Sequence, residues 1–224
     1  MALRLFLDSA DTAAWGEWLP SGLFHGITTN PTLLRRAGVP CQIEAIAELC
    51  HQALAMGCRE VQAQAWGADA TALEACGRAL AALAPGTLTV KLPVTRSGAA
   101  AAAGLIQAGV PVTFTACYEV PQVLVAAALG ARYIAPYLGR IEDQGRDGTA
   151  ALVAMQRCLR GTGSSVRLLV ASLRNAETLS RLAAEGLDTF TISPAVAAEL
   201  FTSIATEAAA AQFEQDAQAA GNAE

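Results

Sequence analysis

The sequence predicts an α/β protein, a compact (β/α)8 TIM barrel with an extra C-terminal helix. Short apolar or β-branched runs recur along the 224 residues, and a segment with helical spacing, rich in Ala, Leu and Glu, follows each run. Continuous apolar strands that alternate with helices indicate a parallel sheet covered on both faces. Eight such units fill about two hundred residues, which is the size of a small barrel.

The first four units occupy the first half of the chain. The apolar or β-branched runs at 3–7, 26–29, 60–65 and 87–92 are the expected strands. The helical spacing that follows them predicts helices at 12–18, 43–56, 69–83 and 97–107. Asp11 is the expected N-cap of the first helix. Gly57, Gly86 and Gly109 stand just before the next strands, where a left-handed residue commonly ends a helix.

The last four units follow the same pattern. Their expected strands are 112–115, 133–135, 166–171 and 189–192, and their expected helices are 120–129, 148–159, 176–184 and a segment from Pro194 onward. Gly130 and Gly186 are again expected C-caps. An open doubly wound sheet is the alternative architecture, but no Gly-rich phosphate loop follows the first strand.

The chain is expected to form one domain, residues 1–224. No low-complexity linker divides it. Residues 206–224 are left over after the eighth helix, and Phe213 is the large apolar side chain among them. We expect this helical tail to pack on a neighbouring subunit.

Composition excludes several classes of partner. The formal net charge is −5, so the chain lacks the basic surplus that binds nucleic acid or an anionic membrane. No uncharged apolar stretch is long enough to span a bilayer, and the N-terminus lacks a secretory pattern, so a cytoplasmic location is expected. The six cysteines form no CxxC pair and the two histidines have no acidic or cysteine neighbours at ligand spacing, so no metal site is expected.

Polar, reaction-capable side chains stand at the carboxyl ends of seven consecutive expected strands. In strand order they are Asp8; Thr28, Thr29 and Asn30; Gln64; Lys91; Thr113 and Thr115; Tyr137 and Arg140; and Ser172 and Arg174. Barrel enzymes assemble their chemistry at this end of the strands. The pattern therefore predicts a catalytic or binding site there.

Lys91 is the one lysine beside fourteen arginines, and it lies in the apolar run Leu88–Pro93. Burial without a partner depresses the pKa of an ammonium group, and a neutral amine in a cavity is what condensation with a carbonyl requires. The same segment is also compatible with a lysine that extends from the strand end into solvent.

The other candidates carry both a functional and a structural interpretation. Asp8 lies within the apolar strand, where a carboxylate steers a proton or holds a hydroxyl, although it also suits a helix cap. Asn30 before Pro31 favours a turn by itself, and Gln64 is compatible with a surface amide. Arg140, Arg174 and Ser172 suit a phosphate group; arginines elsewhere are ordinarily solvated.

Six segments together resemble the small transaldolase family, which includes fructose-6-phosphate aldolase. They are Phe-Leu-Asp-Ser-Ala-Asp at 6–11, Gly-Ile-Thr-Thr-Asn-Pro-Thr at 26–32, Val-Lys-Leu-Pro-Val-Thr at 90–95, Ala-Pro-Tyr-Leu-Gly-Arg at 135–140, Val-Ala-Ser-Leu-Arg at 170–174 and Phe-Glu-Gln-Asp at 213–216. The resemblance spans the chain in order. It implies a class I (Schiff-base) aldolase on a (β/α)8 barrel without metal or organic cofactor.

The resemblance also implies a role for each site residue. Lys91 forms an imine with a ketose carbonyl, and Asp8 handles the hydroxyl whose deprotonation breaks the carbon–carbon bond. Thr28 and Asn30 position the lysine and the dihydroxyacetone unit. The phosphate is held by Arg140, Ser172 and Arg174. Members of the family assemble as pentamers paired into decamers, which implies a homo-oligomer here.

The branch of the family decides the activity. Gln64, Thr115 and Tyr137 resemble the aldolase branch, in which they surround a water that shuttles the proton. These residues favour cleavage and formation of fructose 6-phosphate from dihydroxyacetone and glyceraldehyde 3-phosphate. The segments 138–140 and 146–148 instead resemble transaldolases of the pentose phosphate pathway, which transfer the dihydroxyacetone unit from a donor such as sedoheptulose 7-phosphate. A non-catalytic phosphosugar-binding barrel is the third interpretation.

Overall fold

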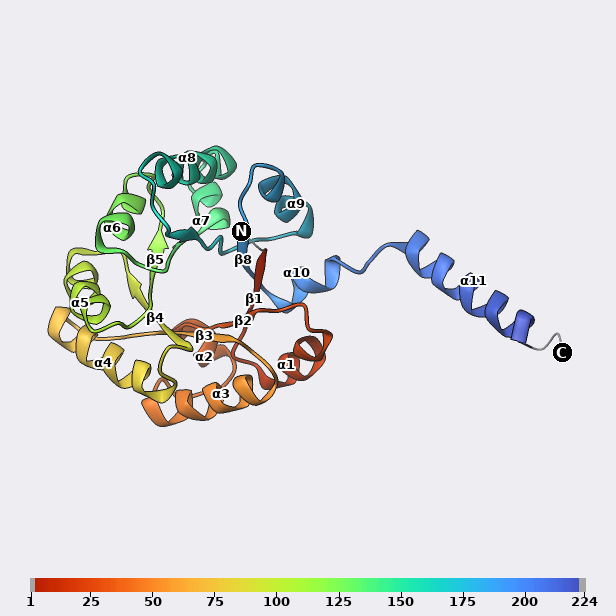
Figure 1. The fold of residues 1–224 in the computed structure, drawn as a ribbon, viewed down its shortest axis with the longest axis horizontal. Helices are drawn as coiled ribbons and strands as arrows, with labels where there is room; N and C mark the ends of the chain where they lie inside the picture. The colour runs from red at the N-terminus through yellow and green to blue at the C-terminus, as the bar shows by residue number, and fades with distance from the viewer. Residues whose placement is uncertain (1–2, 222–224) are drawn as a thin grey trace.

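Eight parallel strands curl into a barrel in the computed structural model, which describes residues 3–221 (Figure 1). The strands are β1 (Arg4–Asp8), β2 (Gly26–Thr28), β3 (Glu60–Gln64), β4 (Leu88–Pro93), β5 (Val112–Cys117), β6 (Tyr133–Pro136), β7 (Arg167–Leu168) and β8 (Thr189–Ile192). Their spatial order is β7-β6-β5-β4-β3-β2-β1-β8. Val170, just after β7, forms a parallel bridge with Phe190 of β8 and so joins the two ends of the sheet. The predicted (β/α)8 barrel is confirmed, and the open doubly wound sheet is not formed.

The helices form a ring outside the strands (Figure 1). Those that were expected are α1 (Thr12–Trp18), α3 (Ile43–Ala55), α4 (Ala70–Leu83), α5 (Arg96–Gln107), α6 (Gln122–Leu129), α8 (Gly148–Gly161), α9 (Ala176–Ala184) and α10 (Pro194–Glu199). Asp11 caps α1 as predicted, since its carboxylate accepts the N–H of Ala13. The five glycines expected as C-caps all have positive φ. The main apolar core lies between this ring and the strands, with Trp15, Leu80 and Leu105 fully buried in it.

Three local features differ from the sequence expectation. Strand β7 pairs regularly only over Arg167–Leu168, although 166–171 were expected, because the chain beyond it is held by single bridges and turns at Ser172, whose φ is 59°. A short helix α2 (Pro31–Arg36) directly follows β2, and another, α7 (Leu138–Asp143), directly follows β6. Each has six residues, too few for the apolar periodicity that predicts a helix.

The interior of the barrel is partly polar. Gln62 of β3 accepts a hydrogen bond from the Thr113 hydroxyl of β5 at 2.9 Å and donates to Glu60 at 2.9 Å. A small apolar cluster separate from the main core accompanies these contacts; it consists of Phe6, Tyr133, Ala135 and Leu169. Within residues 3–221, every buried side-chain nitrogen or oxygen has a hydrogen-bond partner. A polar interior of this kind is stable only when it is fully paired in this way.

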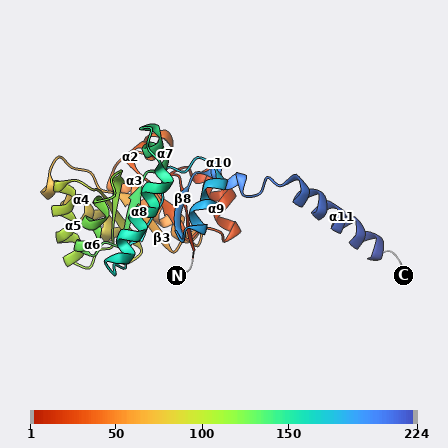
Figure 2. The same cartoon turned by 90° about the horizontal axis from the view of Figure 1, so that it is seen from above.

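The C-terminal helix α11 (Ile204–Gly221) projects away from the barrel, and Figure 2 shows the same separation from above. The helix predicted from residue 206 begins slightly earlier, and residues 222–224 of that prediction lie outside the described residues. Ile204 and Phe213 are 86% and 70% exposed. That a neighbouring subunit covers this helix stays a prediction. Across residues 3–221, none of the helices combines the length and apolar character that crossing a bilayer requires.

Candidate active site

A cavity of about 450 Å³ opens at the carboxyl ends of the barrel strands. Its lining residues come from strand ends and from the loops after them: Asp8, Asn30, Pro31, Thr32, Leu33, Arg36, Gln64, Lys91, Ala135, Tyr137, Arg140, Leu169, Ala171, Ser172 and Thr191. Of the strand-end residues that the sequence singled out, all except Thr28, Thr29, Thr113, Thr115 and Arg174 line this cavity. The structure therefore brings together side chains that lie far apart in the sequence, at the end of the barrel where enzymes of this fold carry their chemistry.

Lys91 of β4 lies at the floor of this cavity and is only 4% exposed, so the expected burial of this lysine is confirmed. Its Nζ donates a hydrogen bond to the Thr29 carbonyl oxygen at 2.9 Å. Burial lowers the pKa of the Lys91 ammonium below its usual 10.5, and the negative charge of Asp8 opposes that shift. Since burial dominates, the neutral amine is more accessible at physiological pH than in an ordinary lysine.

Asp8, the last residue of β1, is held by a chain of hydroxyl groups. The Thr28 hydroxyl of β2 donates to Asp8 Oδ1 at 2.6 Å, and the Thr28 and Thr191 hydroxyl oxygens are 2.5 Å apart. Because Thr28 has one hydroxyl proton, its donation to Asp8 requires Thr191 to donate to Thr28. Thr28 is fully buried and lies beneath the cavity, where it orients the carboxylate.

Tyr137 faces the cavity from the residue that follows β6. Its phenol oxygen lies 2.7 Å from the Thr115 hydroxyl of β5, which is itself buried below the cavity. Burial raises the pKa of the Tyr137 phenol, so the group is protonated at neutral pH and is able to donate. Gln64 ends β3 in register with Lys91 and is half-buried. Among the described residues its amide has no hydrogen-bond partner, which leaves it able to bind a water or a substrate.

Asn30 forms the turn expected from the sequence, and it also lines the cavity. Its Oδ1 accepts the N–H groups of Thr32 and Leu33 at 2.9 and 3.0 Å and thereby starts helix α2, with Pro31 at the first helical position. The rest of its amide faces the cavity. Helix α2 also brings Arg36 to the cavity wall, which the sequence reasoning missed. An Asn cap followed by Pro is a helix-start signal that predicts this helix.

Arg140 and Ser172 also line the cavity. Gly139 allows their elements to approach, because a Cβ there would lie 2.7 Å from the Ser172 carbonyl oxygen. Arg174 does not line the cavity. Its guanidinium donates to the Gly139 carbonyl at 2.9 Å and binds the Asp143 carboxylate, an exposed ion pair on α7. The phosphate role expected for Arg174 thus stays a prediction, whereas Arg36 and Arg140 reach the cavity directly.

Comparison with known proteins agrees with the resemblance of the motifs. The sequence model of the family described as "Transaldolase/Fructose-6-phosphate aldolase" matches residues 5–224. The chain belongs to this transaldolase/fructose-6-phosphate aldolase family. A protein named "Probable transaldolase" from Caulobacter sp. (strain K31) is 36% identical over 214 residues, which cover 96% of each chain. Another of that name from Hyphomonas neptunium is 34% identical over 219 residues, covering 98% of this chain and 99% of the relative.

A solved structure with a related fold is a flavocytochrome b2 variant with sulfite bound. It superposes with a TM-score of 0.56 at 12% identity, over 85% of this chain and 57% of that one. At this identity the likeness concerns the barrel fold alone.

Membership of the transaldolase/fructose-6-phosphate aldolase family makes the chain an enzyme of the aldolase or transaldolase type. The non-catalytic phosphosugar-binding barrel is therefore not supported. Within residues 3–221, no three His, Cys, Asp or Glu side chains are grouped as ligands of a metal ion would be. Cys117, at the end of β5, is buried, and burial raises the pKa of its thiol to about 12, which makes it unreactive as a nucleophile at neutral pH.

Proposed function

We propose that this protein is a class I aldolase that cleaves and forms fructose 6-phosphate through a Schiff base on Lys91. The observation that supports this most strongly is the buried amine at the floor of the cavity, close enough to Asp8 for the carboxylate to oppose its pKa shift. The neutral Nζ attacks the C2 carbonyl of the ketose, and loss of water gives an iminium ion. This cation withdraws electrons from the neighbouring carbon–carbon bond.

Asp8 is the proposed base for the bond-breaking step. Its carboxylate takes the proton of the C4 hydroxyl, the C3–C4 bond breaks, and its electron pair moves toward the iminium nitrogen to give an enamine. Glyceraldehyde 3-phosphate leaves as the new aldehyde. The hydrogen bond from Thr28 holds Asp8 Oδ1 in place and leaves the other carboxylate oxygen for the substrate hydroxyl.

Tyr137, Thr115 and Gln64 are the proposed proton path for the second half of the reaction. The enamine must gain a proton at C3, and water must then hydrolyse the iminium ion to release dihydroxyacetone and the free amine. The protonated Tyr137 phenol contacts the Thr115 hydroxyl, and the Gln64 amide has no hydrogen-bond partner within residues 3–221; both support an ordered water at this point. A retained water favours aldol cleavage, since transfer requires the enamine to survive until a second aldehyde arrives.

Arg140, Arg36 and Ser172 are the proposed phosphate-binding residues, because all three line the cavity. Two guanidinium groups and a hydroxyl match the charge and the acceptor oxygens of a phosphate ester. We further propose that the enzyme acts in the cytoplasm as a homo-oligomer, with α11 covered by a neighbouring subunit. The exposed Ile204 and Phe213 on that helix support this assembly.

Transaldolase activity is the second candidate, and the relatives support it. The two similar proteins from Caulobacter and Hyphomonas carry the name "Probable transaldolase". This activity would use the same imine on Lys91 but pass the dihydroxyacetone unit to erythrose 4-phosphate.

A product assay separates the two activities. Fructose 6-phosphate alone should give glyceraldehyde 3-phosphate and free dihydroxyacetone over many turnovers. Product that forms only after erythrose 4-phosphate is added would instead establish the transaldolase. Lys91→Met is the control in both assays, and it should abolish product in either case.

A further inference from the structure

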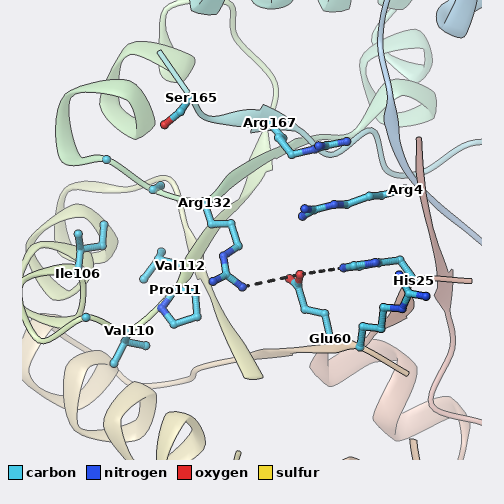
Figure 3. Close-up of a pocket in the computed structure, with 14 residues that line it drawn as sticks. Arg4, His25, Glu60, Ile106, Val110, Pro111, Val112, Arg132, Ser165 and Arg167 are labelled. Carbon is cyan, nitrogen blue, oxygen red and sulfur yellow. Dashed lines mark ion pairs between the residues drawn. The ribbon is translucent and has the colours of Figure 1, made fainter. Parts of the chain in front are cut away.

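A second and larger cavity, of about 880 Å³, lies at the opposite end of the barrel (Figure 3). Its charged lining residues begin a strand or stand just before one: Arg4, His25, Arg59, Glu60, Arg132 and Arg167. The apolar residues Ile106, Val110, Pro111 and Val112, from the end of α5 to the start of β5, form another wall. We call this pocket the arginine cavity. The amino ends of the strands form it, whereas Lys91 lies at the carboxyl ends.

The arginine cavity carries a surplus of positive charge. Its four arginines face two carboxylates, those of Glu60 and of Asp188, which pairs with Arg167 at 3.0 Å. Glu60 is buried and lies 3.6 Å from His25 Nε2 and 3.8 Å from Arg132. Figure 3 shows it between these two side chains. Four positive charges against two negative ones leave two unneutralised charges around a concave surface, before any charge on His25 is counted. Such a surface attracts anions.

Hydrogen bonds and one arginine charge keep Glu60 ionised. Burial alone would raise the pKa of its carboxyl group, yet hydrogen bonds with His25, Thr89 and Tyr133, together with the charge of Arg132, outweigh burial and lower it. The Thr89 and Tyr133 hydroxyls donate to Glu60 at 2.8 and 2.9 Å. The carboxylate is thus ionised and satisfied by neutral donors from the barrel interior, so the guanidinium groups do not have to neutralise it by close contact.

Two of the arginines have guanidinium N–H groups that are available to bind a ligand. Arg59 is exposed, and among the described residues its guanidinium makes no hydrogen bond or ion pair. Arg132 has a side chain 39% exposed, and its contacts are long, 3.8 Å to Glu60 and 3.5 Å to the Thr89 hydroxyl. Arg4, by contrast, binds the Tyr133 hydroxyl. A planar guanidinium with free N–H groups binds a phosphate group through two parallel hydrogen bonds.

We propose that the arginine cavity binds an organic diphosphate, with Arg59 and Arg132 on the phosphate groups and the organic portion against Ile106, Val110 and Pro111. The two exposed guanidinium groups, of Arg59 and Arg132, match two phosphate groups, and the volume exceeds what an inorganic diphosphate fills. Charged contacts at this end of a barrel ordinarily serve stability alone. The exposed guanidinium donors of Arg59 and Arg132 and the charge surplus go beyond that need. This site is separate from the cavity that contains Lys91, which we call the sugar phosphate cavity. The proposal does not rest on the proposed function.

Isothermal titration calorimetry with inorganic pyrophosphate and with ADP, in metal-free buffer of low ionic strength, tests this proposal. Both probes should bind the wild-type enzyme, ADP more tightly because it also covers the apolar wall. Arg59→Gln should weaken both about tenfold, the value of a charged hydrogen bond, and adding Arg132→Gln should weaken them further. Arg157→Gln, which removes an exposed charge elsewhere, and Arg140→Gln, at the mouth of the other cavity, should change neither affinity.

Three results would overturn the proposal. One is the absence of binding of either probe to the wild-type enzyme. Another is binding that Arg140→Gln removes and Arg59→Gln leaves intact, which would locate the anion in the sugar phosphate cavity. The third is ADP binding no tighter than pyrophosphate, which would remove the apolar wall from the site. Because Arg59 has no partner among the described residues, its substitution tests binding without disturbing the barrel.

Discussion

The hydroxyl group of Thr28 should be required for activity even though it does not line the active-site cavity. Thr28→Val keeps the shape of the side chain but removes the hydrogen bond to Asp8 Oδ1 (2.6 Å) and the contact with the Thr191 hydroxyl (2.5 Å). Thr28 is fully buried, so water does not replace the missing group. The Asp8 carboxylate then loses the donor that fixes its orientation.

The two lost contacts set the expected magnitude. A hydrogen bond to a charged group is worth about 1.5–3 kcal/mol, and the neutral contact with Thr191 about 1 kcal/mol, so Thr28→Val should lower the free energy of unfolding by about 2.5–4 kcal/mol. If the bond to Asp8 is needed to hold the base in the transition state, its 1.5–3 kcal/mol also appears in catalysis, as a fall in kcat/KM of about 10- to 100-fold.

Matched variants separate positioning from general destabilisation. Urea unfolding and steady-state cleavage of fructose 6-phosphate should be measured for Thr28→Val, Thr28→Ser and Thr113→Val. Thr28→Ser keeps the hydroxyl and should recover most of the activity. Thr113→Val removes a buried hydrogen bond to Gln62 (2.9 Å) that does not involve Asp8, so it should lower stability while leaving kcat/KM within about threefold. Equal losses of activity in Thr28→Val and Thr113→Val would refute the positioning role.

Three further predictions concern the same cavity. Tyr137→Phe should lower the rate of dihydroxyacetone release about 100-fold relative to transfer to erythrose 4-phosphate, as loss of a proton donor does; an unchanged ratio of the two products would exclude it from the proton path. Arg36→Gln should raise KM for fructose 6-phosphate about tenfold and leave the KM for dihydroxyacetone in the synthetic direction unchanged, and equal changes in both would contradict a phosphate contact. Lys91→Met should stabilise the fold most at low pH. The pKa of Lys91 is lowered below 10.5 in the folded state, so the unfolded chain binds the proton more tightly than the folded protein does. The wild type therefore loses stability as the pH falls from the unfolded-state pKa of Lys91 to its lower folded-state pKa. Urea unfolding of both proteins at about pH 7 and about pH 10 checks the sign, and a gain that grows with pH would be the opposite of this prediction.

Much of the fold could be predicted because each strand–helix unit carries its own local signals. The apolar runs locate the strands, and glycines such as Gly130 end helices through a left-handed residue whose conformation depends on the local backbone alone. Helices α2 and α7 could not be predicted from periodicity, because one and a half turns bury too few side chains to produce an apolar pattern. The irregular pairing after β7 depends on contacts with Phe190, far along the chain, and no local signal encodes it.

The candidate site followed from one geometric rule, that parallel strands in a barrel deliver their last residues to the same end. That rule predicts from the sequence alone that Asp8, Lys91 and Tyr137 lie at the same site. It could not distinguish residues at the cavity surface from those beneath it, such as Thr28, because that depends on side-chain direction and depth. The position of Arg174 after a strand also did not predict that its side chain pairs with Asp143.

The arginine cavity could not be predicted from the sequence. His25 has no acidic or cysteine neighbour at ligand spacing in the sequence, so no metal site is expected at it. Strand pairing in the barrel nevertheless brings Glu60 to within 3.6 Å of its Nε2, and both lie among arginines from separate strands. Clusters formed by register across a sheet leave no spacing pattern in the sequence.

Borohydride trapping is the most direct test of whether Lys91 forms an imine with the substrate. The enzyme should be incubated with dihydroxyacetone, reduced with borohydride, and its intact mass measured, followed by peptide mapping. We expect a gain equal to dihydroxyacetone minus one oxygen atom, located on Lys91, the single lysine of the chain, and absent from Lys91→Met. An unchanged wild-type mass, or an adduct that persists in Lys91→Met, would contradict Schiff-base chemistry at this amine.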